Sequence, residues 1–368
     1  MNLRTSAISR LLAALTIACL SVSALAQSGS KSADSAHAQA AVAALQQWYV
    51  PQDGLYWTTG WWNAANAITA LANYSRVSHS NEYLPLFANT LRAAPASHRG
   101  FSGFINNYYD DEGWWALAWI DVYDLTKQPQ YLEAAISIFR DMQKGWDTGS
   151  CNGGVWWNKK TGGKNAIENE LFLAVAASLA NRAATQAERT EALGWAQREW
   201  AWFRDSGMIN SDHLVNDGLN YHDPAHCKNN GANTWSYNQG VILGGLVELN
   251  RAAPNPSLIQ TARSIALAAI QHLTDTDGVL HESSKAHTGG DVPQFKGIFS
   301  RNLMLLNNAF PDRRYQSFAR ANAQALWSKD RDAANHFGFY WGGPFDMPDA
   351  SRQSSALDAL VAAAALKR

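Results

Sequence analysis

Twelve helical patterns follow one another along the chain, and this succession constrains the fold more than any other feature. Apolar residues recur at helical spacing over residues 36–49, 61–77, 81–94, 111–126, 130–144, 165–183, 186–205, 236–251, 257–273, 295–308, 314–329 and 351–367. Residues 130–144 carry an apolar stripe and a polar face, typical of a half-exposed helix, whereas residues 241–249 are apolar nearly all round, typical of a buried one. This alternation predicts an all-α fold, an (α/α)6 barrel with six inner and six outer helices. An irregular helical bundle or an open solenoid is the alternative.

The connections between these patterns also alternate, in length. Links that enter the predicted outer helices are short, such as residues 127–129 and 184–185. Links that enter the inner helices are long and rich in glycine and aromatic residues. Long loops inside a compact domain are usually functional, and in a closed ring they would meet at one rim, above the N-termini of the inner helices. No linker divides residues 36–368, which predicts a single catalytic domain.

The first 26 residues have the pattern of a secretory signal peptide. Arg4 and Arg10 precede an apolar run, and the small residues before position 27 form a cleavage site. Residues 27–35 are small and polar, and we expect a disordered leader there. We therefore expect a secreted or periplasmic protein once the segment ending at Ala26 is removed.

Charge and hydropathy exclude two classes of partner. Without Arg4 and Arg10 the chain has 28 basic residues against 31 acidic ones, which is no basic footprint for nucleic acid. No later apolar stretch is long and uncharged enough to span a bilayer. We expect a monomer that binds neither nucleic acid nor a membrane.

Two cysteines remain after the predicted cleavage, Cys151 and Cys227, each in a long loop before an inner helix. An even pair in an oxidising compartment indicates a disulfide, with two free thiols as the alternative. Cysteine and histidine do not show the spacing of metal ligands, so we expect no metal site.

The most informative stretch places Asp110, Asp111 and Glu112 between two tyrosines and two tryptophans. Acids at a helix start often only cap it. However, paired carboxylates are what glycoside hydrolysis requires, and flat aromatic rings are surfaces on which sugars stack. Neighbouring residues within a helix do not face each other, so Asp110 and Asp111 can cooperate only where the helix begins. We predict a catalytic pair at the rim.

Related polar and aromatic residues open the predicted inner helices. Their side chains can bind sugar hydroxyls or stack on sugar rings, and they can equally cap helices or tie loops together. Trp115 beside the acids is as compatible with the barrel core as with substrate. The candidate substrate-binding residues are Tyr109, Trp62, Asn63, Asn165, Trp235, Tyr237, Asn238, Gln239 and Lys296.

Taken in order, these motifs resemble glycoside hydrolase family 76, the endo-α-1,6-mannanases. The resemblance covers essentially the whole mature chain and is carried by Tyr109-Asp110-Asp111, residues 151–157, Lys164-Asn165 with Asn169, residues 237–240 and residues 295–299.

That resemblance implies an (α/α)6 barrel, a mannan or mannose-containing glycan as substrate and no metal or organic cofactor. It also implies a retaining mechanism in which Asp110 is the nucleophile and Asp111 the acid/base. A transglycosylase that remodels cell-wall glycans, a non-catalytic glycan-binding protein on the same scaffold and, more distantly, a polysaccharide lyase or unsaturated-uronide hydrolase are the alternatives.

Overall fold

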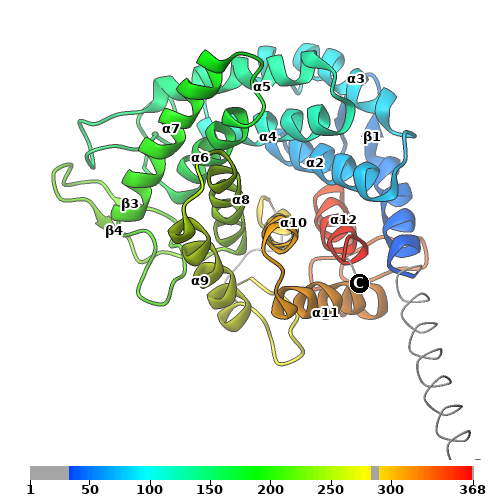
Figure 1. Cartoon of the computed structure of the whole chain (residues 1–368). Coiled ribbons are helices and arrows are strands. Elements are labelled where there is room, and N and C mark those ends of the chain that lie inside the picture. The colour runs from blue at the N-terminus through cyan, green and yellow to red at the C-terminus, as the bar shows by residue number, and fades with distance from the viewer. Residues whose placement is uncertain (1–32, 283–289, 367–368) are drawn as a thin grey trace, which may run out of the picture.

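The computed structural model describes residues 33–282 and 290–366, and this part of the chain is a succession of twelve helices (Figure 1). They are the helix over residues 33–45, α2 (Trp61–Ser78), α3 (Leu84–Ala93), α4 (Tyr109–Thr126), α5 (Pro129–Met142), α6 (Ala166–Ala180), α7 (Gln186–Asp205), α8 (Ser236–Ala252), α9 (Pro256–His272), α10 (Phe295–Ala309), α11 (Arg313–Lys329) and α12 (Ala350–Ala364). The predicted signal peptide lies outside the described residues. Residues 33–35, expected in the disordered leader, belong instead to the first helix.

Short elements occupy the loops between the helices. The 3-10 turns are η1 (Gln46–Trp48), η2 (Ala94–Ala96), η3 (Ser102–Phe104), η4 (Gln143–Gly145) and η5 (Val292–Gln294), and the strands are β1 (Tyr49–Val50), β2 (Leu55–Tyr56), β3 (Leu219–Asn220) and β4 (Lys228–Asn229). β1 pairs antiparallel with β2, with Tyr49 opposite Tyr56, and β3 pairs antiparallel with β4, with Leu219 opposite Asn229. Both hairpins lie in loops that enter inner helices.

The even-numbered helices form a closed ring. α2 packs on α4, α4 on α6, α6 on α8, α8 on α10 and α10 on α12, and α12 returns to α2. Outside this ring, α5, α7, α9 and α11 pack on α4, α6, α8 and α12, as Figure 1 shows. The predicted (α/α)6 barrel is confirmed. Within the described residues, we find no helix with both the length and the apolar content to cross a membrane.

The inner helices are buried because their sequences have no continuous polar face. All 15 residues of α6 are buried, and so are all 15 of α12. Glycines let neighbouring inner helices approach closely. A Cβ atom on Gly240 would lie 2.6 Å from the Cα of Phe299, and one on Gly297 would lie 2.6 Å from the Cα of Ser355. Close contact of α8 with α10, and of α10 with α12, therefore requires glycine at these positions.

The barrel has two different ends. The inner helices begin at one end, where aromatic side chains from the starts of α2, α4, α8 and α10 contact one another. They finish at the other end, where the C-terminal halves of α2, α4, α6, α8 and α10 line a common cavity. We call these ends the N-terminal mouth and the C-terminal mouth.

Candidate active site

The three consecutive acids lie in the first turn of α4, at the N-terminal mouth. Tyr108 is still extended, with φ −123° and ψ 121°, and the helix begins at the next residue. The backbone N–H of Tyr109 donates to the carbonyl of Trp157 at 3.0 Å, which fixes the point where the chain turns. Asp110 and Asp111 are therefore at a helix mouth, and both residues are half-buried.

Asp110 is oriented by a tryptophan from the loop before α6. The Trp157 indole Nε1 donates to Asp110 Oδ2 at 3.0 Å, whereas Oδ1 is buried without a hydrogen-bond partner in the protein. Burial raises the pKa of Asp110 to about 6, against the lowering effect of the Trp157 hydrogen bond. One oxygen is thus held by the protein and the other is not.

Asp111 has a different environment. Its Oδ2 accepts a hydrogen bond of 2.6 Å from the Asn106 side-chain amide. Burial, and then the negative charge of Asp110, raise the pKa of Asp111 to about 8. Two close carboxyl groups resist ionising together. The raised pKa values therefore indicate that the pair as a unit binds one proton near neutral pH.

Glu112, the third acid, belongs to a separate cluster. Its carboxylate is fully buried and lies 2.8 Å from Lys159 Nζ, which also contacts Asp141 at 2.5 Å. Burial raises the pKa of Glu112 to about 8 although Lys159 opposes the shift. Glu112 therefore packs with a lysine from the loop before α6 and an acid from α5.

The structure adds carboxyl groups that the sequence analysis did not single out. Glu168 is fully buried, and its pKa is raised by burial and by the charge of Asp110. Glu170 is also fully buried, and neither of its carboxyl oxygens has a hydrogen-bond partner. Asp217 accepts a hydrogen bond of 3.4 Å from Asn238, and its charge adds to the raised pKa of Glu170. Two glutamates within three residues at the start of a mostly apolar helix were the available signal for Glu168 and Glu170.

Asn165 combines with Glu168 in a capping box at the start of α6. The Asn165 backbone N–H donates to Glu168 Oε1 at 2.5 Å, and the spacing of three residues between the two fits this motif. Asn165 therefore caps the helix that carries Glu168 and Glu170 and fixes where that helix begins.

Aromatic side chains from four inner helices line the same mouth. Trp62 stacks on Trp114 with ring centroids 5.4 Å apart, and Tyr237 stacks on Phe295 at 3.9 Å with the planes 6° apart. Trp235 meets Phe295 edge-on at 5.6 Å. Trp62, Tyr237 and Trp235 are only partly buried, so each keeps part of its surface exposed at the mouth.

Two of the proposed hydroxyl-binding amides instead tie loops to helices. The Gln239 side chain is fully buried, accepts from the Val215 N–H and donates to the Val215 carbonyl, both at 2.8 Å. The Asn63 amide donates to Gln294 Oε1 at 3.0 Å and is 3% exposed. For these residues the structure favours the loop-tying alternative.

Lys296 and the two aromatic neighbours of the acids are also buried. Lys296 is 2% exposed and donates to the carbonyl of Phe339, and burial lowers its pKa to about 8. Tyr109 is 5% exposed, whereas Tyr108 is 39% exposed and contacts Trp157 with ring centroids 5.0 Å apart. Trp115 is fully buried and therefore belongs to the barrel core.

Cys151 and Cys227 form a disulfide, as predicted. It joins the loop before α6 to the loop before α8, and the Cys151 N–H also donates to the carbonyl of Pro224 at 2.8 Å. The two long loops are thus covalently linked beside the mouth that holds the acids.

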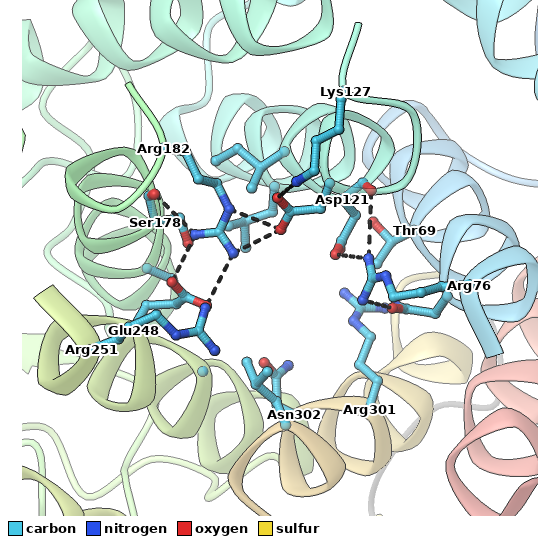
Figure 2. A pocket seen from close by; sticks show the side chains of 17 residues that line it. Thr69, Arg76, Asp121, Lys127, Ser178, Arg182, Glu248, Arg251, Arg301 and Asn302 are labelled. Carbon is cyan, nitrogen blue, oxygen red and sulfur yellow. Dashed lines mark hydrogen bonds and ion pairs between the residues drawn. The ribbon is translucent and has the colours of Figure 1, made fainter. Parts of the chain in front are cut away.

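At the C-terminal mouth, charged side chains surround a cavity of about 360 Å³ (Figure 2). Arg182 lies 2.8 Å from Asp124 and 2.7 Å from Glu248, and Arg76 lies 2.9 Å from Asp121. The cations there also face the negative ends of five helix dipoles. These charged groups compensate one another, so we place the candidate active site at the N-terminal mouth.

Comparison with known proteins identifies the family. Residues 32–368 match the model of glycosyl hydrolase family 76. The chain belongs to this family. Among its family-76 relatives, mannan endo-1,6-alpha-mannosidase DCW1 of Candida albicans is 26% identical over 278 residues, 69% of this chain and 60% of that protein. The chain thus spans about three fifths of the length of this curated relative.

Solved structures of the family share the fold. The alpha-1,6-mannanase GH76A of Salegentibacter sp. HEL1_6 superposes with a TM-score of 0.79 at 25% identity, over 90% of this chain and 99% of that chain. An inactive variant of that mannanase, with two adjacent aspartates replaced by asparagine, forms a complex with alpha-1,6-mannotriose. It superposes with a TM-score of 0.79 at 24% identity, over 90% of this chain and 99% of that chain.

Proposed function

We propose that this family-76 protein is a secreted, endo-acting glycoside hydrolase that cleaves α-1,6-mannosidic linkages by a retaining double displacement. The observation that carries the proposal is the pair Asp110 and Asp111 at the mouth of α4, whose surroundings separate their pKa values. A nucleophile must be ionised when its partner acid is protonated. We assign the ionised member to Asp110 and the protonated member to Asp111.

In the proposed mechanism, Asp110 attacks the anomeric carbon while Asp111 donates its proton to the leaving oxygen. The Trp157 indole donates to Asp110 Oδ2 at 3.0 Å and so orients the carboxylate that attacks. Asp111 then takes a proton from water, which displaces Asp110 from the covalent glycosyl-enzyme intermediate. Each step inverts the configuration at the anomeric carbon, so the product keeps the α configuration.

Two further observations support a neutral mannan as the substrate. Trp62, Trp235 and Tyr237 offer aromatic faces at the mouth, and a neutral glycan offers C–H faces and hydroxyls rather than charge. In the inactive variant of the Salegentibacter mannanase that binds α-1,6-mannotriose, two adjacent aspartates are replaced by asparagine. Asp110 and Asp111 are likewise adjacent in this chain.

Secretion rests on the signal-peptide pattern of residues 1–26 together with the disulfide, a bond favoured in oxidising compartments. N-terminal sequencing of the exported protein should find a mature chain that begins at Gln27. A mature chain that retains Met1 would contradict this part of the proposal.

The catalytic test is digestion of linear α-1,6-mannan, followed by sizing of the products and NMR of the first product. We expect a ladder of short oligosaccharides with the α configuration. Asp110→Asn and Asp111→Asn should each lower activity by several orders of magnitude, whereas Asp205→Asn, at the exposed end of α7, should not. A variant of the pair that keeps more than about a tenth of the activity, a barrier change below ~1.4 kcal/mol, contradicts the role of that residue.

The same digestion separates hydrolysis from its main alternative. A covalent intermediate can be transferred to a sugar hydroxyl instead of water. Products longer than the starting glycan would indicate a transglycosylase. Binding without any cleavage would indicate a glycan-binding protein.

A further inference from the structure

Trp57 is an unusually exposed tryptophan in the short loop between β2 and α2. Its exposed fraction is 62%, the largest among the big apolar side chains of the described residues. Single exposed apolar residues are common and need no functional explanation on their own. The way in which this loop is held distinguishes Trp57 from an incidental surface residue.

Hydrogen bonds from neighbouring segments hold the backbone around Trp57 in place. The Trp57 N–H donates to the carbonyl of Trp48 at 2.6 Å. Arg99 Nη2 donates to the carbonyls of Tyr56 at 3.0 Å and Thr59 at 2.9 Å, so that one guanidinium group holds the loop on both sides of the tryptophan. The position of an exposed ring is therefore set in advance.

The same loop is also tied to the start of α12. Thr58 Oγ1 accepts a hydrogen bond of 3.1 Å from the Ala350 N–H, and the hydroxyls of Thr59 and Ser351 are hydrogen-bonded to each other. A tryptophan on a fixed loop offers a large, rigid contact surface that loses little conformational entropy on binding.

A cavity of about 460 Å³ lies beside this ring. Its lining includes Trp57, Arg99, Asp291, Asp349 and Ser351, and therefore combines an aromatic face with carboxylates and a hydroxyl. Small-ligand sites are typically clefts of roughly 300–1,000 Å³ with a few polar groups that set orientation. The size and the lining suit one sugar residue.

The cavity is on the same face of the barrel as the acids. Asp291 accepts a hydrogen bond of 2.8 Å from Trp62, and its negative charge contributes to the raised pKa values of both Asp110 and Asp111. α2 packs between α4, which carries the acids, and α12, whose start borders the cavity. Packed helices lie roughly 8–10 Å apart, so the cavity is about one to two helix spacings from the catalytic pair.

We propose that this cavity is a distal glycan subsite, in which a sugar several residues away from the cleaved bond stacks on Trp57. The hydroxyls of that sugar donate to the Asp291 carboxylate, and its C–H face covers the indole. The proposal rests on the proposed cleavage of an α-1,6-linked mannan. It predicts that the enzyme favours long chains over short ones, because only a long chain reaches both the acids and Trp57.

The test compares kcat/KM on long linear α-1,6-mannan with kcat/KM on mannotriose. Aromatic contacts of this kind correspond to roughly a two- to ten-fold change in affinity. In Trp57→Ala, the ratio of the two kcat/KM values should fall by about five-fold, mainly through KM, and Trp57→Phe should restore part of it. Arg99→Met should lower the same ratio by releasing the loop. Arg92→Met, on the exposed face of α3, is the matched control and should keep the ratio of the wild type.

The outcomes distinguish the two proposals. If the wild type cleaves both substrates and Trp57→Ala keeps the wild-type ratio, the subsite is refuted while the mannanase assignment stands. If the wild type cleaves neither, the proposed reaction fails, and binding of long mannan to the wild type and to Trp57→Ala then decides the subsite. Equal binding by the two proteins, or no binding, overturns it, and weaker binding by Trp57→Ala supports it.

Discussion

At the scale of single residues, the two adjacent carboxyl groups have different hydrogen-bond partners. Because the pKa values of the two carboxyl groups are raised to about 6 and about 8, the form of the pair that holds one proton dominates between these values. We expect kcat/KM on mannan to rise as pH increases through about 6 and to fall as it increases through about 8. These limbs report the pair as a unit. A pH profile measured on linear mannan checks this, and a profile without an acidic limb would contradict it.

Glu112 is the control for this profile, since its pKa is also raised to about 8. Its carboxylate is bound to Lys159, outside the Asp110–Asp111 pair. Glu112→Gln should therefore keep both limbs of the profile and most of the activity. If this variant lost the fall in kcat/KM near pH 8, Glu112 would be the general acid in place of Asp111.

The tryptophans divide into core and mouth residues, and a matched pair of substitutions tests the division. Trp115 is fully buried, so Trp115→Ala should lower the free energy of unfolding by about 3–5 kcal/mol. Trp62 is partly exposed and donates to Asp291, so Trp62→Ala should instead weaken oligosaccharide binding and change stability by less. Urea unfolding and titration of mannotriose into Asp110→Asn backgrounds measure both effects. A larger stability loss for Trp62→Ala than for Trp115→Ala would reverse the assignment.

At the scale of elements, the loops before α6 and α8 depend on one another through the disulfide. The bond closes a sequence separation of 76 residues. Chain-entropy models assign roughly 3–5 kcal/mol to a loop of this length. We expect reduction of the folded protein, or Cys151→Ala with Cys227→Ala, to lower stability by about that amount. Thiol titration of the unfolded, unreduced protein should find no free thiol, and two titratable thiols would disprove the bond in the expressed protein.

The helices could be predicted from sequence because their signal is local. Apolar spacing over residues 165–183 and 236–251 fell on α6 and α8 with small errors at the ends. The catalytic candidates were also local, since Asp110 and Asp111 are neighbours in sequence. The roles of single polar residues were not local. Gln239 looked like a sugar ligand, but its partner is the backbone of Val215, 24 residues away.

Contacts between distant loops account for the other residues that the sequence did not reveal. Asp291 and Trp57 both lie in irregular segments, and nothing in their neighbouring residues marks them. Asp291 bonds to Trp62, 229 residues away, and the loop of Trp57 is tied to Ala350 by a hydrogen bond across 292 residues. Such pairs exist only once the ring has closed and brought the segments before α10 and α12 close to the start of α2.

At the scale of the whole molecule, the two mouths of the barrel differ in their charged groups. The N-terminal mouth holds carboxyl groups with raised pKa values. At the C-terminal mouth, Arg182 at the end of α6 joins Asp124 of α4 to Glu248 of α8, and all three residues line the same cavity. Figure 2 shows Arg182 and Glu248 facing it. Glu248 also pairs with Arg251 at 2.7 Å. These ion pairs connect three consecutive inner helices of the ring.

We therefore expect Arg182→Met to destabilise the barrel without altering the chemistry at the other mouth. The Arg182 side chain is 13% exposed, and its replacement leaves Asp124 with the exposed Lys127 and Glu248 with Arg251. Removing one partner of a buried ion pair costs about 3–5 kcal/mol. Because these remaining cations compensate in part, we expect the free energy of unfolding measured in urea to fall by about 2–4 kcal/mol, with kcat on mannan within about two-fold of wild type.

Arg204→Met is the matched control, because the ion pair of Arg204 with Asp205 is exposed. It should change the free energy of unfolding by less than about 0.5 kcal/mol. Equal stability of the two variants would mean that the ring closes by apolar packing alone.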